Sequence, residues 1–335
     1  MRPMKTANAS SVPGVIEILS AGFDQVNRIP WILSIPIVLD LILWLAPRLS
    51  AAPVFHRWAT KLSAVYGSVA ASGVDDSTVK VIQDRLSEFD ASSSAFNLLF
   101  LIPNNLAQFP TINPSSITGS FSLELNSGGI LVAVAVGFLV LGTLIGCVYR
   151  GLLAQQVRDK RVDPAKLAPK IGFYLSSIIG FILLAIVAVV AIMIPIGILI
   201  GVASLLSPSI GVVLLSAMGA AANVLGILGA IYLYFLIDAI VVSGVGPIRA
   251  SVNSGRVVAN NFWSAIFFIG LVIVISQGTS LIWDQVDQIP IGIVLAIVAN
   301  AYVGTGLTAA SMLFYQSRVA RLPAARGVLG RVSRA

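Results

Sequence analysis

The sequence predicts an all-α fold, a polytopic transmembrane helical bundle with about six spans. Charged residues make up only 10% of the chain, whereas a typical soluble domain carries about 25%, because a soluble surface needs charge and a lipid-facing surface does not tolerate it. The mean hydropathy of +0.94 agrees. No Asp, Glu, Lys or Arg occurs between Lys170 and Asp238. Since one span needs about 20 mainly apolar residues, this window alone accommodates two.

An amphipathic segment precedes the first span. We expect residues 1–28 to form a cytoplasmic N-terminus with a one-sided helix, which either lies in the membrane interface or packs on the bundle. The first span, 29–46, then lies between Trp31 and Trp44, and tryptophan prefers the headgroup level of a bilayer. Pro47 ends this span. The apolar residues of the amphipathic segment recur at helical spacing: Val12, Val15, Ile16, Leu19, Phe23 and Val26.

Residues 47–128 differ in kind, since they contain many charged, Ser and Asn residues. We expect an extracytoplasmic, mainly helical cap, with one amphipathic helix that starts near residues 75–78 and carries Leu86 and Phe89. The apolar stretch Ala95–Ile102 is too short to span, so we expect it to rest on the bundle. The prolines that follow it predict a loop.

Five further spans are expected in 129–315, with cytoplasmic loops at 150–170 and 238–262 and a basic cytoplasmic tail at 316–335. The third span of the chain is expected to bend or end near Pro195. The five spans are 129–149, 171–194, 210–237, 263–282 and 289–315. Small residues four apart favour close helix approach, and they are Gly142 and Gly146, Gly197 and Gly201, and Ala222 and Gly226.

Two segments suggest an internal repeat. Gly14–Trp31 and Gly246–Trp263 have equal length, share Gly, Ile, Val and Trp at matching positions, and each leads into a span. The region 150–170 also precedes a span. Either the chain consists of three parallel units, each a juxtamembrane helix followed by a spanning hairpin, or the match is a coincidence.

The basic residues predict the orientation. With six spans both termini share one side, and that side carries 16 of the 21 Lys and Arg residues, which leaves 5 for the cap. The positive-inside rule then predicts that both termini are cytoplasmic, in a multi-pass protein of the cell inner (plasma) membrane. The net charge of +7 favours contact with anionic headgroups. No compact basic domain is visible that would favour binding to nucleic acid.

The residue types needed for most catalytic and cofactor sites are scarce. One histidine, His56, and one cysteine, Cys147, cannot supply paired haem ligands or a multi-residue zinc site. The pattern of a phosphate-binding P-loop does not occur. We therefore expect no enzyme activity, no metal and no cofactor.

Polar residues inside the expected spans form the candidate site. An ionised carboxylate is costly within a membrane and suggests function by default, so Asp40 in the first span is the main candidate, with Arg48 within reach. We favour a structural carboxylate, protonated or paired, over proton or ion passage. The other polar positions, expected to form interhelical hydrogen bonds, are Asn223, Gln277 and Asn300. At the membrane interface we expect Asp238, Arg249, Arg256, Trp31 and Trp263.

The stretch Asp238–Trp263 reads DAIVVSGVGPIRASVNSGRVVANNFW. It resembles a signature of bacterial multi-pass proteins related to the membrane domain of glycerophosphoryl diester phosphodiesterases. In that group an acidic residue ends a span, an amphipathic segment with a basic-serine pattern follows, and an Asn-x-Trp-like pattern enters the next span. The resemblance implies a multi-pass membrane fold and no activity, because this chain has no counterpart of the soluble phosphodiesterase domain. The fitting residues are Arg249, Ser251, Arg256, Asn261 and Trp263.

These observations favour a non-enzymatic membrane protein, a scaffold or accessory subunit of a membrane assembly. Its expected partners are lipid and either another membrane protein or a second copy of the chain. The alternative is a small-solute or ion transporter that uses Asp40. A continuous polar path between the spans would favour transport, whereas a closed, dry bundle with a partner face would favour the scaffold.

Overall fold

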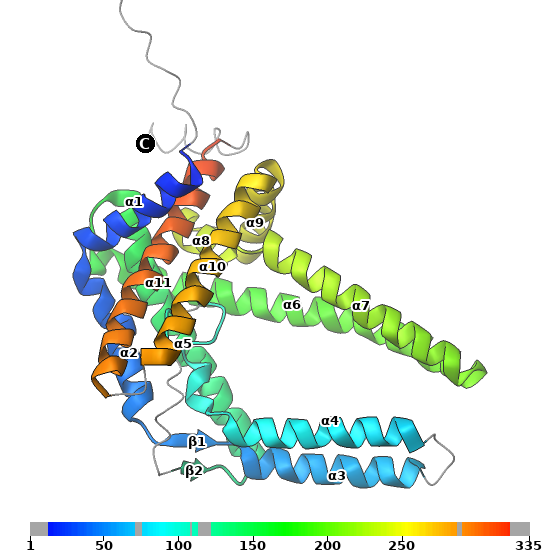
Figure 1. The fold of residues 1–335 in the computed structure, drawn as a ribbon. Coiled ribbons are helices and arrows are strands. Elements are labelled where there is room, and N and C mark those ends of the chain that lie inside the picture. The colour runs from blue at the N-terminus through cyan, green and yellow to red at the C-terminus, as the bar shows by residue number, and fades with distance from the viewer. Residues whose placement is uncertain (1–12, 71–75, 108, 113–121, 287–289, 322–335) are drawn as a thin grey trace, which may run out of the picture. The chain divides into compact units, whose positions relative to one another are not determined.

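The computed structural model describes residues 13–70, 76–107, 109–112, 122–286 and 290–321, which are mainly helical (Figure 1). Val12, residue 75 and most of the basic tail lie outside these described residues, whereas the helix expected to start near 75–78 begins at Asp76. The chain divides into two compact units. Unit 1 comprises Met1–Leu33, Cys147–Leu281 and Tyr302–Ala335, and unit 2 comprises Ser34–Gly146 and Ile282–Ala301.

Five helical segments of the described chain are long and apolar enough to cross a membrane, which confirms the transmembrane helical fold in its broad form. They are α5 (Gly128–Asp159), α6 (Pro164–Leu206), the window Ser209–Ser243 that contains α7 and α8, and windows within α10 (Phe262–Val286) and α11 (Pro290–Val319). A sixth span results only if α1 (Val15–Arg28) and the following residues 30–45 count as one broken span.

The expected first span is shorter than predicted. A single 3₁₀ turn, η1 (Pro30–Leu33), precedes the 12-residue helix α2 (Ser34–Leu45). The residue before a proline avoids the helical region, and Ile29 has φ −135° and ψ 58°. The helix α1 therefore ends at Arg28 instead of continuing into a long span.

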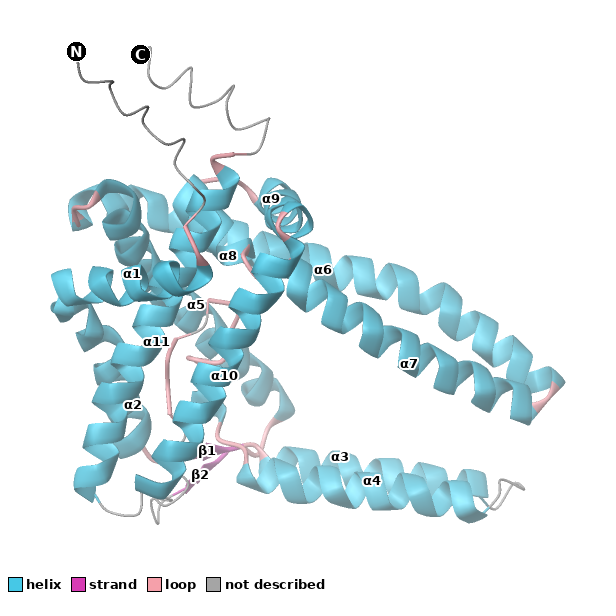
Figure 2. Cartoon of the chain, turned by 45° about the horizontal axis from the view of Figure 1, so that its top comes forward, coloured by secondary structure: helices cyan, strands magenta, loops and turns pink. Residues whose placement is uncertain are grey.

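A long apolar hairpin dominates unit 1. The helix α6 has 43 residues and continues through Pro195 to Leu206, so of the alternatives for this span the prolonged helix is found rather than an end at that proline. Pro195 frees backbone groups of the helix from their hydrogen bonds, and a membrane offers these groups no better partners than the helix itself. After Ser207 the chain turns into α7 (Pro208–Tyr232), which lies beside α6 in both views (Figures 1 and 2).

The two segments of the suggested repeat share one local structure. α1 and α9 (Pro247–Asn260) both have 14 residues, a glycine N-cap in extended conformation, and a C-cap N–H that bonds to a matching valine carbonyl, of Val26 and Val258. Every buried residue of α9 matches a buried residue of α1: Ala250 with Ile18, Ser254 with Gly22, Val257 with Gln25, and Val258 with Val26. The region 150–170 does not follow this pattern, because α5 runs straight through to Asp159.

Unit 1 also contains an aromatic core. Phe235 and Phe314 stack with ring centroids 5.1 Å apart, and Phe268 stacks on Phe314 at 4.8 Å. Close to this core, α1 crosses α11 where two glycines meet, since a Cβ on Gly22 would lie 2.6 Å from the carbonyl oxygen of Gly306. The aromatic rings and the close crossing hold α1, α10 and α11 around the short helix α8 (Leu236–Ser243).

The described part of residues 47–128, where we expected a mainly helical cap, is mainly helical and lies in unit 2, while its place outside the membrane stays a prediction. The helices α3 (Ala52–Ala70) and α4 (Asp76–Ala95) lie side by side as a hairpin (Figure 2). Two short strands pair in parallel at the hairpin's base, β1 (Arg48–Ser50) with β2 (Ser122–Glu124). The 3₁₀ turn η2 (Leu98–Leu101) follows α4. A small core joins the turn to α5: Leu98, Ala51, Val54 and Leu131.

Candidate functional site

The best-connected polar groups of unit 1 surround α8, which continues the α7 span after a break at residues 233–235. A break in a spanning helix leaves backbone groups that water cannot satisfy. The Ser254 hydroxyl, fully buried on α9, satisfies two of them. It accepts a hydrogen bond from the N–H of Phe235 at 3.1 Å and donates one to the carbonyl of Tyr232 at 2.7 Å.

Asp238 lies in the first turn of α8 and is only 1% exposed. Its Oδ1 lies 3.2 Å from Nη1 of Arg150 on α5, and its Oδ2 accepts a hydrogen bond from the hydroxyl of Ser311 on α11. The positive end of the helix dipole also favours a carboxylate at this place. Asp238 is thus buried among three helices, and its expected place at the membrane interface stays a prediction.

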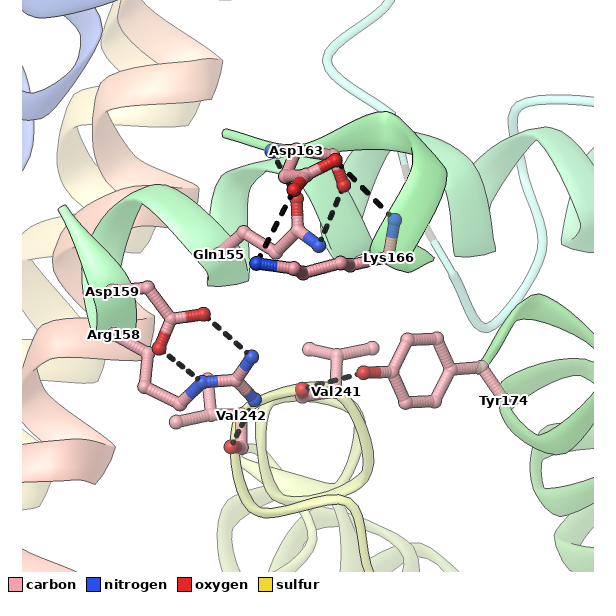
Figure 3. Close-up of polar contacts among 8 residues, drawn as sticks. All are labelled: Gln155, Arg158, Asp159, Asp163, Lys166, Tyr174, Val241 and Val242. Carbon is pink, nitrogen blue, oxygen red and sulfur yellow. Dashed lines mark hydrogen bonds and ion pairs between the residues drawn. The ribbon is translucent and has the colours of Figure 1, made fainter. Parts of the chain in front are cut away.

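The other end of α8 is held by side chains from three helices. The Arg158 guanidinium donates to the carbonyl of Val242 at 3.4 Å, and the Tyr174 hydroxyl donates to the carbonyl of Val241 at 3.2 Å (Figure 3). Ser243 and Tyr315 share a hydrogen bond of 2.9 Å. The bonds from Arg158 and Tyr174 satisfy carbonyls that a helix C-terminus leaves free. Gly244, with φ 62°, ends the helix in the left-handed region that glycine adopts readily.

The connection between α5 and α6 is equally well bonded. Gln155 donates to the carbonyl of Asp163 at 3.1 Å and accepts from its N–H at 3.0 Å, and Asp163 caps α6 (Figure 3). Partial desolvation acts to raise the pKa of Asp163, but hydrogen bonds from the N–H and ammonium of Lys166 hold it below its ordinary value. Arg158 also binds Asp159 through two bonds of 2.8 Å. This connection is therefore a rigid part of the network.

The arrangement around α8 can fix helices but offers little chemistry. Each polar group above has its partner within the chain, and a satisfied buried network specifies one packing. Among the residues that the structure describes, no group of three His, Cys, Asp or Glu side chains could hold a metal ion. Sequence reasoning missed Ser254 and Ser311, because serine is frequent in this chain and neither position stands out from its neighbours.

Four of the residues expected at the membrane interface have exposed side chains. Arg249 and Arg256 are exposed on α9, beside the exposed apolar side chains of Ile248 and Val252. Trp263 follows and is 81% exposed; Trp31, at the matching position after α1, is 50% exposed. Exposed arginine and tryptophan together are typical of helices at a lipid surface.

The main sequence candidate, Asp40, belongs to unit 2. Its side chain is buried at 2% exposure, and its Oδ2 accepts a hydrogen bond from the N–H of Ile112 at 3.4 Å. Its Oδ1 has no partner among the described residues. The suggestion that Arg48 reaches it is wrong for the described residues, since no ion pair joins the two; the backbone of Arg48 lies in β1, opposite Ser122 of β2.

The remaining candidates do not form one site. Asn223 is exposed and bonds back to the carbonyl of Gly219 in its own helix, and Gln277 is also exposed. Asn300 of unit 2 has a buried Nδ2 without a hydrogen-bond partner among the described residues. No hydrogen bond of the described chain joins any of these three to Asp40.

Comparisons with known protein families, with characterised proteins and with solved structures find no match to this chain. The resemblance of Asp238–Trp263 to the phosphodiesterase membrane domain therefore stays a prediction.

Proposed function

We propose that the chain is a non-enzymatic scaffold or accessory subunit of a membrane assembly, and that the α6–α7 hairpin is its partner-binding part. The observation that carries the proposal is the open apolar surface of this hairpin. In the most apolar window of α6 no residue is buried within the chain.

The surface of the hairpin is suited to close helix approach. Glycines let neighbouring helix backbones come near each other in a membrane. Five glycines of the hairpin face open space. A Cβ added at any of them would lie more than 4 Å from every described atom outside the local helix backbone. They are Gly197, Gly201, Gly219, Gly226 and Gly229. These positions are therefore free to receive a helix of a partner.

The hairpin is also longer than one membrane crossing requires. The charge-free part of α6, residues 171–206, is about 54 Å long at 1.5 Å per residue, whereas the hydrocarbon core is about 30 Å thick. Tilting alone would need an angle beyond the usual range of about 0–40°. Contact with a partner helix can cover the excess apolar surface.

The α8 network gives the hairpin a firm base. The hydrogen bond of Tyr174 holds the start of α6 on α8, and Ser254 holds the end of α7. A rigid base presents the hairpin in one orientation, which an assembly subunit needs. The exposed Arg249 and Arg256 favour contact of the same unit with anionic headgroups.

Cysteine cross-linking in native membranes tests the proposal. Cys147 is the only cysteine, so Gly226→Cys in a Cys147→Ala background carries one reactive thiol. Val224→Cys is the matched control, because Val224 is 58% exposed but lies about 200° around the helix from Gly226. We expect a thiol cross-linker to join Gly226→Cys, and not Val224→Cys, to a partner.

The mass of the adduct identifies the partner. An adduct of twice the chain mass shows a second copy, and another mass shows a different membrane protein. If neither variant forms an adduct, or if both do so equally, the α6–α7 hairpin has no specific partner and the proposal fails.

A further inference from the structure

A segment of unit 2 that is irregular apart from the 3₁₀ turn η2 runs along the apolar part of α5. We call its described residues, 98–107 and 109–112, the re-entrant segment. Leu98 packs in the core with Leu131, the carbonyl of Ile102 lies against Gly142, and Ala107 lies against Gly146. From Leu131 to Gly146 the helix rises about 22 Å, most of the roughly 30 Å of a hydrocarbon core. Asn97, just before the segment, and β2, the next described element after it, both pair with β1, so the segment begins and ends near the same end of α5.

The segment is built to lie at this depth. Irregular backbone at membrane depth is tolerated only where protein buries it or where it lines a water-filled cavity. Gly142 and Gly146 give it room, because an added Cβ at either would overlap the segment. The Asn105 side chain closes the turn by bonding to the carbonyl of Ile102 and to the N–H of Ala107.

Asp40 meets the segment at Ile112, and no ion pair of the described residues involves Asp40. Residues 102–112, 128–146 and 290–301 of unit 2 contain no ionisable side chain. Asp284 of α10 is a further acid, and no ion pair of the described residues joins Arg48 to Asp40. A buried carboxylate without a paired cation is costly.

We propose that Asp40 is a proton-binding site at the re-entrant segment, and that this proton exchanges with the aqueous phase. A metal cation would need several oxygen ligands, whereas the partner that the described residues give Asp40 is a hydrogen-bond donor. On protonation the carboxylate gains a proton and becomes neutral, and Oδ1, which has no hydrogen-bond partner among the described residues, can carry it. The site lies in unit 2 and does not depend on the scaffold role of α6 and α7.

Infrared difference spectra of the full chain in lipid vesicles test the proposal. We expect a protonated-carboxyl band that is lost in Asp40→Asn, is shifted in Asp40→Glu, and rises and falls as the bath pH is changed. Asp90→Asn is the control, because Asp90 lies on α4 and pairs with His56, and it should keep the band. Asp40→Asn preserves an acceptor for the N–H of Ile112, and Asp40→Glu keeps a carboxyl if the Asn variant does not fold.

Three results would overturn the proposal. The first is the absence of a carboxyl band assigned to residue 40 at every pH. The second is a band that does not respond to the bath pH, which would show a sealed structural proton. The third is a band that responds to sodium or potassium at constant pH, which would show a cation site.

Discussion

Removing Arg150 should destabilise unit 1 strongly, because it leaves Asp238 as an unpaired buried charge. Asp238 is 1% exposed and its two side-chain partners are Arg150 at 3.2 Å and Ser311. Breaking a buried pair by removing one partner costs about 3–5 kcal/mol. We therefore expect Arg150→Met to lower the free energy of unfolding by about that amount.

The double variant Arg150→Met, Asp238→Leu separates this cause from a general packing defect. Replacing both members of a buried pair with apolar residues is often neutral or stabilising, so the double variant should recover most of the loss, to within about 1 kcal/mol of the parent. Ser311 can then bond to a carbonyl of its own helix.

The lone cysteine supplies the assay. Cys147 is fully buried, so its reaction with a thiol-reactive dye in detergent or bicelles reports unfolding directly and ranks the variants. Steric trapping then converts this ranking into free energies of unfolding. A loss below about 1 kcal/mol for Arg150→Met would refute the reasoning. A double variant no more stable than the weaker single variant would refute it as well.

Three further changes test other parts of the fold. Gly142→Ala should displace the re-entrant segment and lower the free energy of unfolding by about 1–3 kcal/mol. Gly137→Ala on the same helix, where an added Cβ meets nothing, should be neutral or slightly stabilising. Labelling of Cys147 compares the two variants. Ser254→Ala should cost about 1–3 kcal/mol in the same assay, because two buried backbone groups at the break before α8 lose their partner. Asp163 has a lowered pKa, so its stabilising effect is complete above about pH 4, the ordinary value, and is lost as the pH falls through the folded pKa. Circular dichroism melts at acid pH should show this loss in the parent and not in Asp163→Asn.

Local pattern was enough to predict α1 and the long apolar helices, whereas it did not predict α3. The 3.6-residue periodicity predicted α1, and charge-free windows predicted the apolar helices. The match between Gly14–Trp31 and Gly246–Trp263 also extends to the caps and buried positions of α1 and α9. These features depend on residues close together in the sequence, which is why the sequence alone reveals them.

Long-range contacts were harder to predict. The spacing of Gly142 and Gly146 correctly indicated close approach on α5, but the partner is a loop rather than a helix. Asp40 was correctly selected as a buried polar residue, yet its partner is the backbone of Ile112, which no side-chain pattern reveals. Arg48 was a wrong partner because the helix ends before it and a strand begins.

The re-entrant segment has a consequence for the biogenesis of the protein. Residues 98–112 are made before α5, and by themselves they are too irregular to partition into lipid, since their backbone groups would lack partners there. The Gly142 and Gly146 surface that shelters them exists only after α5 has been synthesised and inserted. Entry of the segment is therefore a late maturation step, so an arrest of synthesis before α5 should leave these residues in water and open to a protease.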